Sequence, residues 1–152
     1  MPVPLTEVQW KRLWEMIRSL EAAGETYEPT RLAFIKGLAL FHLGDVESAV
    51  RLFQEIEGDS ERIHGRRRII RSYLASRPDG RPRRFSGEVA WISGDGTRGD
   101  VYVTELRRRM PFLPRDFRGP DMRRGETLGE FHIAFNFLGP IADPPGHYRP
   151  PR

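Results

Sequence analysis

Arg98-Gly99-Asp100-Val101-Tyr102-Val103 is the stretch of this 152-residue chain that decides its fold. Valine and tyrosine alternate over its second half, a pattern typical of a β-strand with one buried face. The residues before it, Ser86–Ser93, also alternate, with Val89 and Trp91 expected on the same face. The two runs are separated by a glycine-containing turn at Ser93–Gly96. Two alternating runs joined in this way predict a β-hairpin.

Three more strands are expected after this hairpin. Phe112 lies in a short segment interrupted by Pro111 and Pro114, which suits an edge or irregular strand. Residues Phe131–Phe137 form a long apolar run, and Gly139–Ala142 is a short last strand. Five short strands within about 60 residues, separated by turn residues, predict a small closed β-barrel.

Five stretches of this segment follow one another in the same order as the corresponding motifs of a known family. They are Gly87-Glu88-Val89-Ala90-Trp91, Arg98–Val103, the surroundings of Phe112, Arg124-Gly125-Glu126 followed by Phe131-His132-Ile133, and Gly139-Pro140-Ile141-Ala142. In this order they resemble the cold-shock domain. The resemblance covers most of residues 85–143 and implies an oligonucleotide-binding (OB) barrel, with Arg98–Val103 at the position of the first RNA-binding motif.

The chain departs from that family at the positions that would contact nucleic acid. Asp100 stands where the family has an exposed stacking aromatic, and Val101 replaces a glycine. The alternating aromatics of the second motif are reduced to Phe112, and an insert at about Thr104–Arg109 lengthens the loop. These differences affect the binding face rather than the barrel, so the family resemblance predicts the fold more firmly than the affinity.

Residues 1–76 are expected to be helical. Thr6 is placed to cap a first helix whose apolar positions recur at helical spacing, which favours core packing for its two tryptophans. A second helix from Pro29 to about Leu43 and a third over Val46–Glu57 are joined by a Gly-Asp break, so they are expected to be antiparallel neighbours. The first-helix apolar positions are Trp10, Leu13, Trp14, Ile17 and Leu20.

The second and third helices carry a repeat-like pattern. Its positions are Gly37, Leu40, Gly44-Asp45, Ala49 and Phe53, which resemble one tetratricopeptide (TPR) repeat over about 30 residues. The glycine in mid-helix is expected to permit close approach of the two helices. The resemblance implies helix-pair packing and a protein-binding role, and a plain four-helix cap is the alternative.

Positive charge concentrates between the two halves. Residues 62–84 hold nine arginines and one aspartate, whereas residues 1–61 have a net charge of −5. A fourth helix is predicted over Ser60–Ser76, and a basic Pro/Gly linker follows at residues 77–84. Such a band suggests a polyanionic partner. With 23 arginines and only two lysines, however, arginine richness alone can reflect genome composition.

The candidate nucleic-acid-binding residues combine aromatic and cationic side chains. Trp91, Tyr102 and Phe112 would stack bases, although Trp91 suits the barrel core equally well, and Arg98 flanks them. The remaining candidates for holding phosphates are Arg67, Arg68, Arg71, Arg83, Arg84, Arg107, Arg108 and Arg109.

Other classes of function are disfavoured by the sequence. The chain has no cysteine, its four histidines show no ligand spacing, and no nucleophile has a nearby histidine, so neither an enzyme nor a metal or other cofactor is expected. The Gly94–Gly99 match to G-x-G-x-x-G precedes a strand rather than a helix, which indicates a hairpin turn. The N-terminal residues do not have the pattern of a signal peptide, and no apolar run is long enough to span a membrane. A cytoplasmic location is therefore expected.

The sequence therefore predicts an α+β chain with four parts: helices at 1–76, the linker at 77–84, the barrel at 85–143 and a Pro-rich tail at 144–152. The expected function is non-catalytic binding of single-stranded nucleic acid, with RNA favoured over DNA. The alternative is a protein-interaction adaptor that uses the helices, with the barrel as scaffold.

Overall fold

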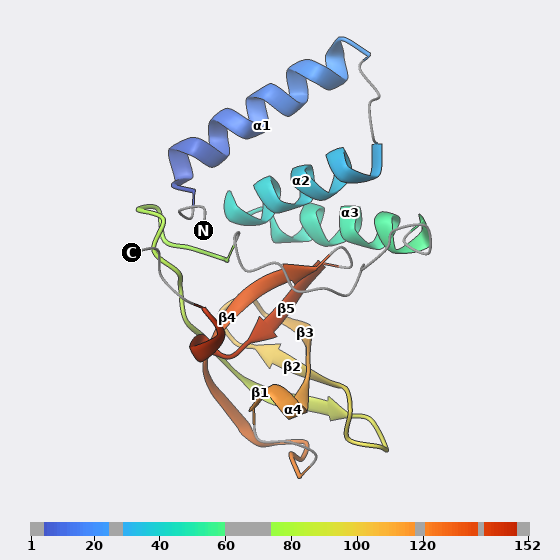
Figure 1. Ribbon diagram of the computed structural model, residues 1–152, viewed down its shortest axis with the longest axis vertical. Helices are drawn as coiled ribbons and strands as arrows, with labels where there is room; N and C mark the ends of the chain where they lie inside the picture. The colour runs from blue at the N-terminus through green and yellow to red at the C-terminus, as the bar shows by residue number, and fades with distance from the viewer. Residues whose placement is uncertain (1–4, 25–28, 60–73, 118–120, 137–138, 149–152) are drawn as a thin grey trace.

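The computed structural model describes residues 5–24, 29–59, 74–117, 121–136 and 139–148 (Figure 1). Helices come first and strands second, as expected for an α+β chain. The elements are α1 (Glu7–Ala22), α2 (Pro29–His42), α3 (Val46–Asp59), β1 (Phe85–Ile92), β2 (Gly99–Val103), β3 (Arg108–Phe112), α4 (Pro114–Phe117), β4 (Thr127–Asn136), β5 (Gly139–Asp143) and a 3-10 turn, η2 (Pro145–His147). No helix in these described ranges is long and apolar enough to cross a membrane.

The five strands close into a barrel in the order β1-β2-β3-β5-β4. Neighbouring strands are antiparallel, except that β3 and β5 meet in parallel at Phe112 and Ala142. The predicted closed barrel of five strands is therefore confirmed. Val89, Val101 and Met110 point into its interior and are almost fully buried, because alternate residues of each strand share a face.

A β-bulge in β1 separates two side chains that strict alternation would place together. Val89 pairs with Val101, and Trp91 pairs with Asp100, so two steps along β1 oppose one step along β2. Val89 is therefore buried, whereas the side chain of Trp91 is turned outward and is 46% exposed. The prediction that both residues share one face was wrong, since the bulge shifts the strand by one residue.

Phe112 belongs to the barrel core, and its prediction as a stacking residue was wrong. It is 1% exposed and lies opposite Gly99 on β2. A Cβ on Gly99 would lie 2.6 Å from Cε1 of the phenyl ring, so the glycine provides the space that this ring fills. The ring also contacts Phe117 of α4 edge to face, at 5.7 Å between centroids.

The helices begin and turn where the sequence predicts. Thr6 and Gln9 form a reciprocal capping box at the start of α1. Gly44, at φ +95°, ends α2, and the Asp45 carboxylate accepts a hydrogen bond from the Ser48 amide at the start of α3. The described helices that precede the barrel number three and include the antiparallel pair α2 and α3, so they do not by themselves form a repeat array.

The close approach predicted at Gly37 is confirmed. A Cβ at this position would lie 2.8 Å from Cε1 of Phe53, so the aromatic ring of α3 rests directly on the backbone of α2. Phe53 is 2% exposed, and its ring also lies 6.0 Å from that of Phe34.

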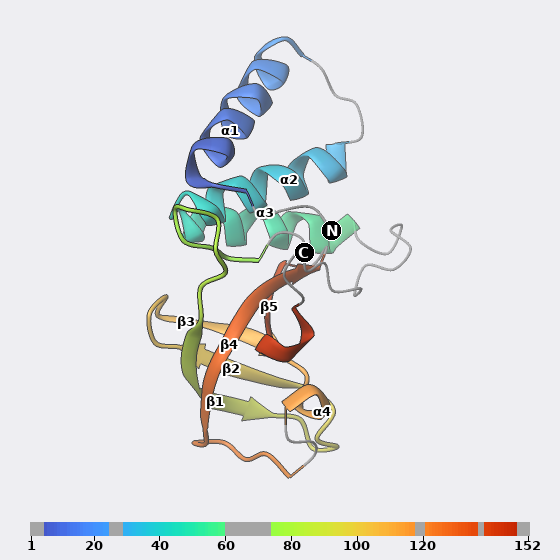
Figure 2. The same cartoon turned by 60° about the vertical axis from the view of Figure 1, so that its left-hand side comes forward.

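The helices and the barrel share one hydrophobic core, as the small size of each half predicts. Figures 1 and 2 show the helices stacked over one end of the barrel, with α3 nearest to β4 and β5. Phe135 of β4 contacts Phe41 at 5.1 Å and Phe53 at 6.1 Å between ring centroids. Gly139 of β5, at φ +122°, approaches Phe53 so closely that a Cβ there would lie 3.2 Å from the Cβ of the phenylalanine.

The fourth predicted helix, Ser60–Ser76, falls mostly outside the described residues. Its last part was predicted wrongly, because residues 74–76 are not helical. Ala75 donates its amide hydrogen to the Ile133 carbonyl, accepts one from the Arg83 amide, and is followed by a β-bridge between Ser76 and Pro82. This segment packs Leu74 against Ala134 of β4, which helps to explain why the second half of that strand is buried on both faces.

Candidate nucleic-acid interface

The outer face of β1, β2 and β3 carries two rows of opposed side chains. In the first row Glu88, Tyr102 and Arg109 face one another across the three strands. In the second row Trp91, Asp100 and Pro111 do the same. Directly opposed side chains lie about 4.5–5.5 Å apart at Cβ, so these six residues form one continuous surface. We call this surface the outer barrel face.

Two aromatic rings stand exposed on the outer barrel face. Trp91 is 46% exposed and Tyr102 is 41% exposed, and they are the two large apolar side chains that are exposed among the described residues of the barrel. Beside Tyr102 is an open hollow of about 240 Å³, lined also by Glu88, Val89, Ala90, Arg109 and Arg124. The structure thus brings Trp91 and Tyr102 together on one surface, and the bulge is what places the tryptophan there.

Arginines border the outer barrel face at both of its loops. Arg98 ends the β1–β2 turn, and Arg107 lies in the β2–β3 turn with a left-handed φ of +53°. Arg98, Arg107 and Arg109 are exposed, and none of them forms an ion pair with another residue of the described ranges. Arg108, beside them, is half-buried.

The β1–β2 turn is held by one carboxylate. Asp95 Oδ1 accepts hydrogen bonds from Ser93 Oγ at 2.7 Å, from Thr97 Oγ1 at 2.7 Å and from the Thr97 amide at 3.1 Å. These bonds lower the pKa of Asp95 to about 2, and the bond from Ser93 Oγ contributes most to the shift. Ser93 Oγ in turn accepts a hydrogen bond from the Arg98 amide, so the turn fixes the backbone from which Arg98 projects. The predicted hairpin at Gly94–Gly99 is confirmed.

Two arginines of the linker are engaged with the barrel. Arg83 pairs with Glu105 at 2.8 Å and covers the ring of Phe85 at 5.0 Å. Arg84 pairs with Glu130 at 2.9 Å. Their charges are therefore partly neutralised, and both side chains tie the linker to the barrel. The other predicted phosphate-binding residues of the band, Arg67, Arg68 and Arg71, lie outside the described residues.

Asp100 sits at the centre of the outer barrel face. It is half-buried, and burial raises the pKa of its carboxyl group, while the positive charge of Arg109 opposes that rise. Within the described part of the chain its carboxylate accepts no hydrogen bond and forms no ion pair. An acidic group in this setting repels phosphate but remains available to hydrogen-bond donors.

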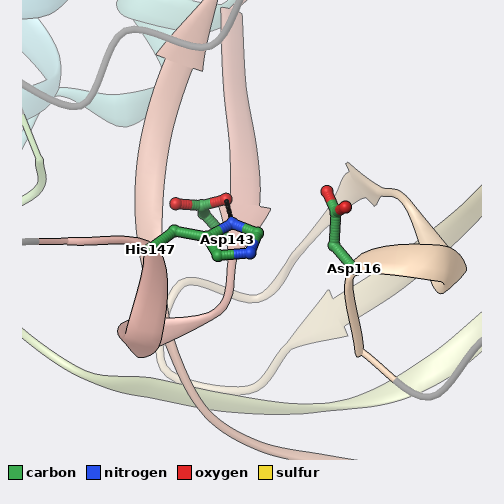
Figure 3. A group of neighbouring side chains, drawn as sticks. All are labelled: Asp116, Asp143 and His147. Carbon is green, nitrogen blue, oxygen red and sulfur yellow. Dashed lines mark hydrogen bonds and ion pairs between the residues drawn. The ribbon is translucent and has the colours of Figure 1, made fainter.

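A second cluster, which sequence reasoning missed, lies where β5 ends. Asp143 is fully buried, and its carboxylate bonds to Nδ1 of His147 at 3.1 Å, while Asp116 of α4 faces the pair (Figure 3). One ligand atom from each of the three residues lies within 4.8 Å of the others. Carboxylate oxygens and imidazole nitrogens suit a divalent cation. The available signal was the four-residue spacing of Asp143 and His147, which η2 converts into a contact.

His132 is another buried polar residue that the sequence analysis did not assign. It lies opposite Asp143 across β4 and β5, and its ring meets that of Tyr148 edge to face. Burial and the charge of Arg84 lower the pKa of His132, although Asp143 acts in the opposite direction. The imidazole is therefore neutral at pH 7 and fills the outer face of β4.

A further cavity of about 250 Å³ lies where the linker passes the helices. The rings of Trp10 and His42 stack on one side of it at 4.1 Å between centroids, and Arg77 and Arg83 line the other. The two ring nitrogens of His42 lie 2.8 Å from the Leu38 carbonyl oxygen and 3.0 Å from the Leu74 carbonyl oxygen, so the ring joins α2 to the chain just before the linker. This cavity belongs to the joint between the two halves of the chain and is separate from the outer barrel face.

Comparison with protein-family models, curated proteins and solved structures found no match to this chain. The assignment of its function therefore depends on the barrel topology and on the chemistry of the outer barrel face.

Proposed function

We propose that this chain is a non-catalytic protein that binds single-stranded nucleic acid, preferably RNA, on the outer barrel face. The observation that carries the proposal is the exposure of Trp91 and Tyr102 on adjacent strands, bordered by arginines without ion pairs in the described ranges. The order β1-β2-β3-β5-β4, together with the cold-shock-like stretches, supports an OB-type barrel, a class that binds oligonucleotides on this face.

Stacking and charge supply the binding energy in this proposal. A base stacked on an exposed aromatic contributes about 1–3 kcal/mol. Trp91 and Tyr102 are diagonal neighbours on β1 and β2, and such neighbours lie about 7–8 Å apart. Two successive bases can therefore use the two rings. Arg98, Arg107 and Arg109 would hold the backbone, which releases counterions and makes affinity fall as salt rises.

The direct test is fluorescence anisotropy of a labelled single-stranded RNA of about 12 nucleotides, which spans one OB-type site. Tyr102→Ala and Trp91→Ala should each weaken binding about 5- to 150-fold, the equivalent of one lost stack. Arg51→Gln is a control for general charge effects, because Arg51 is an exposed arginine of α3 that lies outside the outer barrel face. Binding that is equal for duplex and single strand and unchanged in both aromatic variants would contradict the proposal.

A second candidate function is a protein-interaction adaptor that works through the helices. Four large apolar side chains of α1 and α2 are exposed, namely Val8, Met16, Leu20 and Ile35. Residues 1–61 carry a net charge of −5, so this half does not suit a polyanion. A protein partner retained in high salt, and lost in Met16→Asp, would support this function. Both functions are compatible in one molecule.

A further inference from the structure

We infer that the outer barrel face is selective for guanine, and that Asp100 is the residue that reads the base. This inference rests on the proposed binding of single-stranded nucleic acid and names the base that the same surface prefers. It starts from the position of one carboxylate among exposed rings.

Asp100 is surrounded by the surfaces on which bases would stack. Trp91 opposes it on β1 and Pro111 opposes it on β3, while Tyr102 is two residues along on the same face of β2. A base stacked on Trp91 or Tyr102 therefore presents its edge toward this carboxylate. Glu88, the other acidic residue of the face, directly opposes Tyr102 in the neighbouring row, and its side chain is exposed, whereas Asp100 is half-buried beside Trp91.

The carboxylate of Asp100 has its acceptor positions open. It makes no hydrogen bond or ion pair with any described residue, and it is half-buried on the sheet. Burial raises the pKa of the group, and the positive charge of Arg109 opposes that rise. An ionised carboxylate is an acceptor only, with two oxygens able to receive two parallel N–H bonds.

Guanine is the base whose edge matches two parallel acceptors. Its Watson–Crick edge carries two adjacent donors, the N1–H and the N2 amino group, which form a fork like that of a guanidinium. Adenine and cytosine place a single amino donor beside a ring-nitrogen acceptor, and uracil places its N3–H between two carbonyls. Each of those three edges would set an acceptor against a carboxylate oxygen, and an unsatisfied or repelled polar group lowers affinity.

This pairing also accounts for an acidic residue in a phosphate-binding surface. A carboxylate there weakens backbone binding for every sequence, because it repels phosphate. Two charge-assisted hydrogen bonds to guanine offset that loss for guanine alone. The net effect is discrimination between bases without a gain in general affinity.

The test compares short single-stranded oligouridine RNAs that carry one central guanine, inosine, adenine, cytosine or uracil. Wild-type protein should bind the guanine RNA about 10-fold more tightly than the adenine, cytosine and uracil RNAs, as expected for a bidentate base contact. Inosine keeps the N1–H and lacks the N2 amino group, so its RNA should bind with intermediate affinity. A single guanine in each RNA avoids folded guanine-rich structures.

Two variants test whether Asp100 is the residue that causes the guanine preference. Asp100→Asn keeps the shape of the side chain and removes one acceptor, so the guanine preference should fall to within about twofold while uracil binding stays or improves. Asp121→Asn is the matched control, because it makes the same change at an exposed aspartate outside the outer barrel face, and it should keep the wild-type preference. A guanine preference that persists in Asp100→Asn would overturn the assignment to this residue.

The outcomes separate this inference from the proposed function. Equal binding of all five RNAs by wild-type protein, with salt dependence and the loss in Tyr102→Ala retained, would overturn guanine selectivity and leave single-strand binding intact. Equal affinity for guanine and inosine RNAs would overturn the bidentate contact even if Asp100→Asn did not fold. Absence of binding to every RNA would overturn both.

Discussion

Gly99 and Phe112 face each other across β2 and β3, and the phenyl ring occupies the space that any side chain at residue 99 would need. Gly99→Ala should lower the free energy of unfolding by about 1–3 kcal/mol, the usual cost of overpacking a core. Urea unfolding followed by circular dichroism measures the loss. Gly94→Ala is the control, since a Cβ there meets nothing within 4 Å. Equal stability of the two variants would show that Phe112 moves aside without cost.

Phe53 connects the helical half to the barrel through Gly37 and Gly139. Phe53→Ala should cost about 3–5 kcal/mol of unfolding free energy, because a large buried ring is removed from the shared core. Wild-type protein should unfold in one transition when followed by both circular dichroism and tryptophan emission. Leu20→Ala, at an exposed position of α1, should cost less than about 1 kcal/mol. Two separate wild-type transitions would contradict a shared core.

The bulge in β1 makes Trp91 accessible, whereas Trp10 is buried. In a variant with Trp10→Phe and Trp14→Phe, the remaining Trp91 emission should be quenched readily by acrylamide. Single-stranded RNA should protect it, because a stacked base covers the indole ring. A quenching constant as low as that of a buried tryptophan would show that the Trp91 ring lies in the core and is not part of the interface.

Arg98 and Arg83 should behave differently although both were expected to hold phosphates. Arg98→Gln should reduce the slope of log affinity against log salt by about 0.7, the contribution of one phosphate contact on a single strand. Arg83→Gln should change that slope less, since Arg83 already pairs with Glu105. Its main effect should be a stability loss of less than about 1 kcal/mol, as for other exposed pairs. A larger slope change in Arg83→Gln than in Arg98→Gln would reverse these roles.

Guanine selectivity should depend on pH through Asp100. Burial raises the pKa of this carboxyl above the usual 3.8, so protonation begins at a higher pH than for an exposed aspartate. As pH falls through that raised pKa, the carboxylate loses one acceptor and its charge, so the guanine preference should decrease while binding to uracil RNA increases. Anisotropy titrations from neutral pH downward measure both. A preference that stays constant through protonation in wild type, or that changes identically in Asp100→Asn, would contradict the prediction.

The sequence predicts the barrel well because alternation and turn residues are local signals. The N-cap at Thr6, the close approach at Gly37 and the five strands all follow from residues near one another in the chain. The bulge at Val89–Trp91 does not, because an extra residue in a strand leaves the same alternating pattern until the partner strand fixes the register.

Side-chain partners were harder to predict than backbone elements. Phe112 looked like a ring for stacking because its fit against Gly99 depends on the pairing of β2 with β3. Arg83 and Arg84 looked like free cations because Glu105 and Glu130 lie far along the chain. The cluster of Asp116, Asp143 and His147 was missed, since α4 and η2 approach one another only after the barrel closes.

The core contacts of Phe53 and Phe135 also determine how this protein can be cut or recombined. A fragment beginning at Phe85 would carry the whole barrel but would leave Phe135 without Phe41 and Phe53, so its helix-facing end would be bare apolar surface. Such a fragment would tend to aggregate, as exposed apolar patches do. The composition change at residues 77–84 is therefore a poor place to graft this barrel onto another protein, and a usable module must carry α2 and α3 with it.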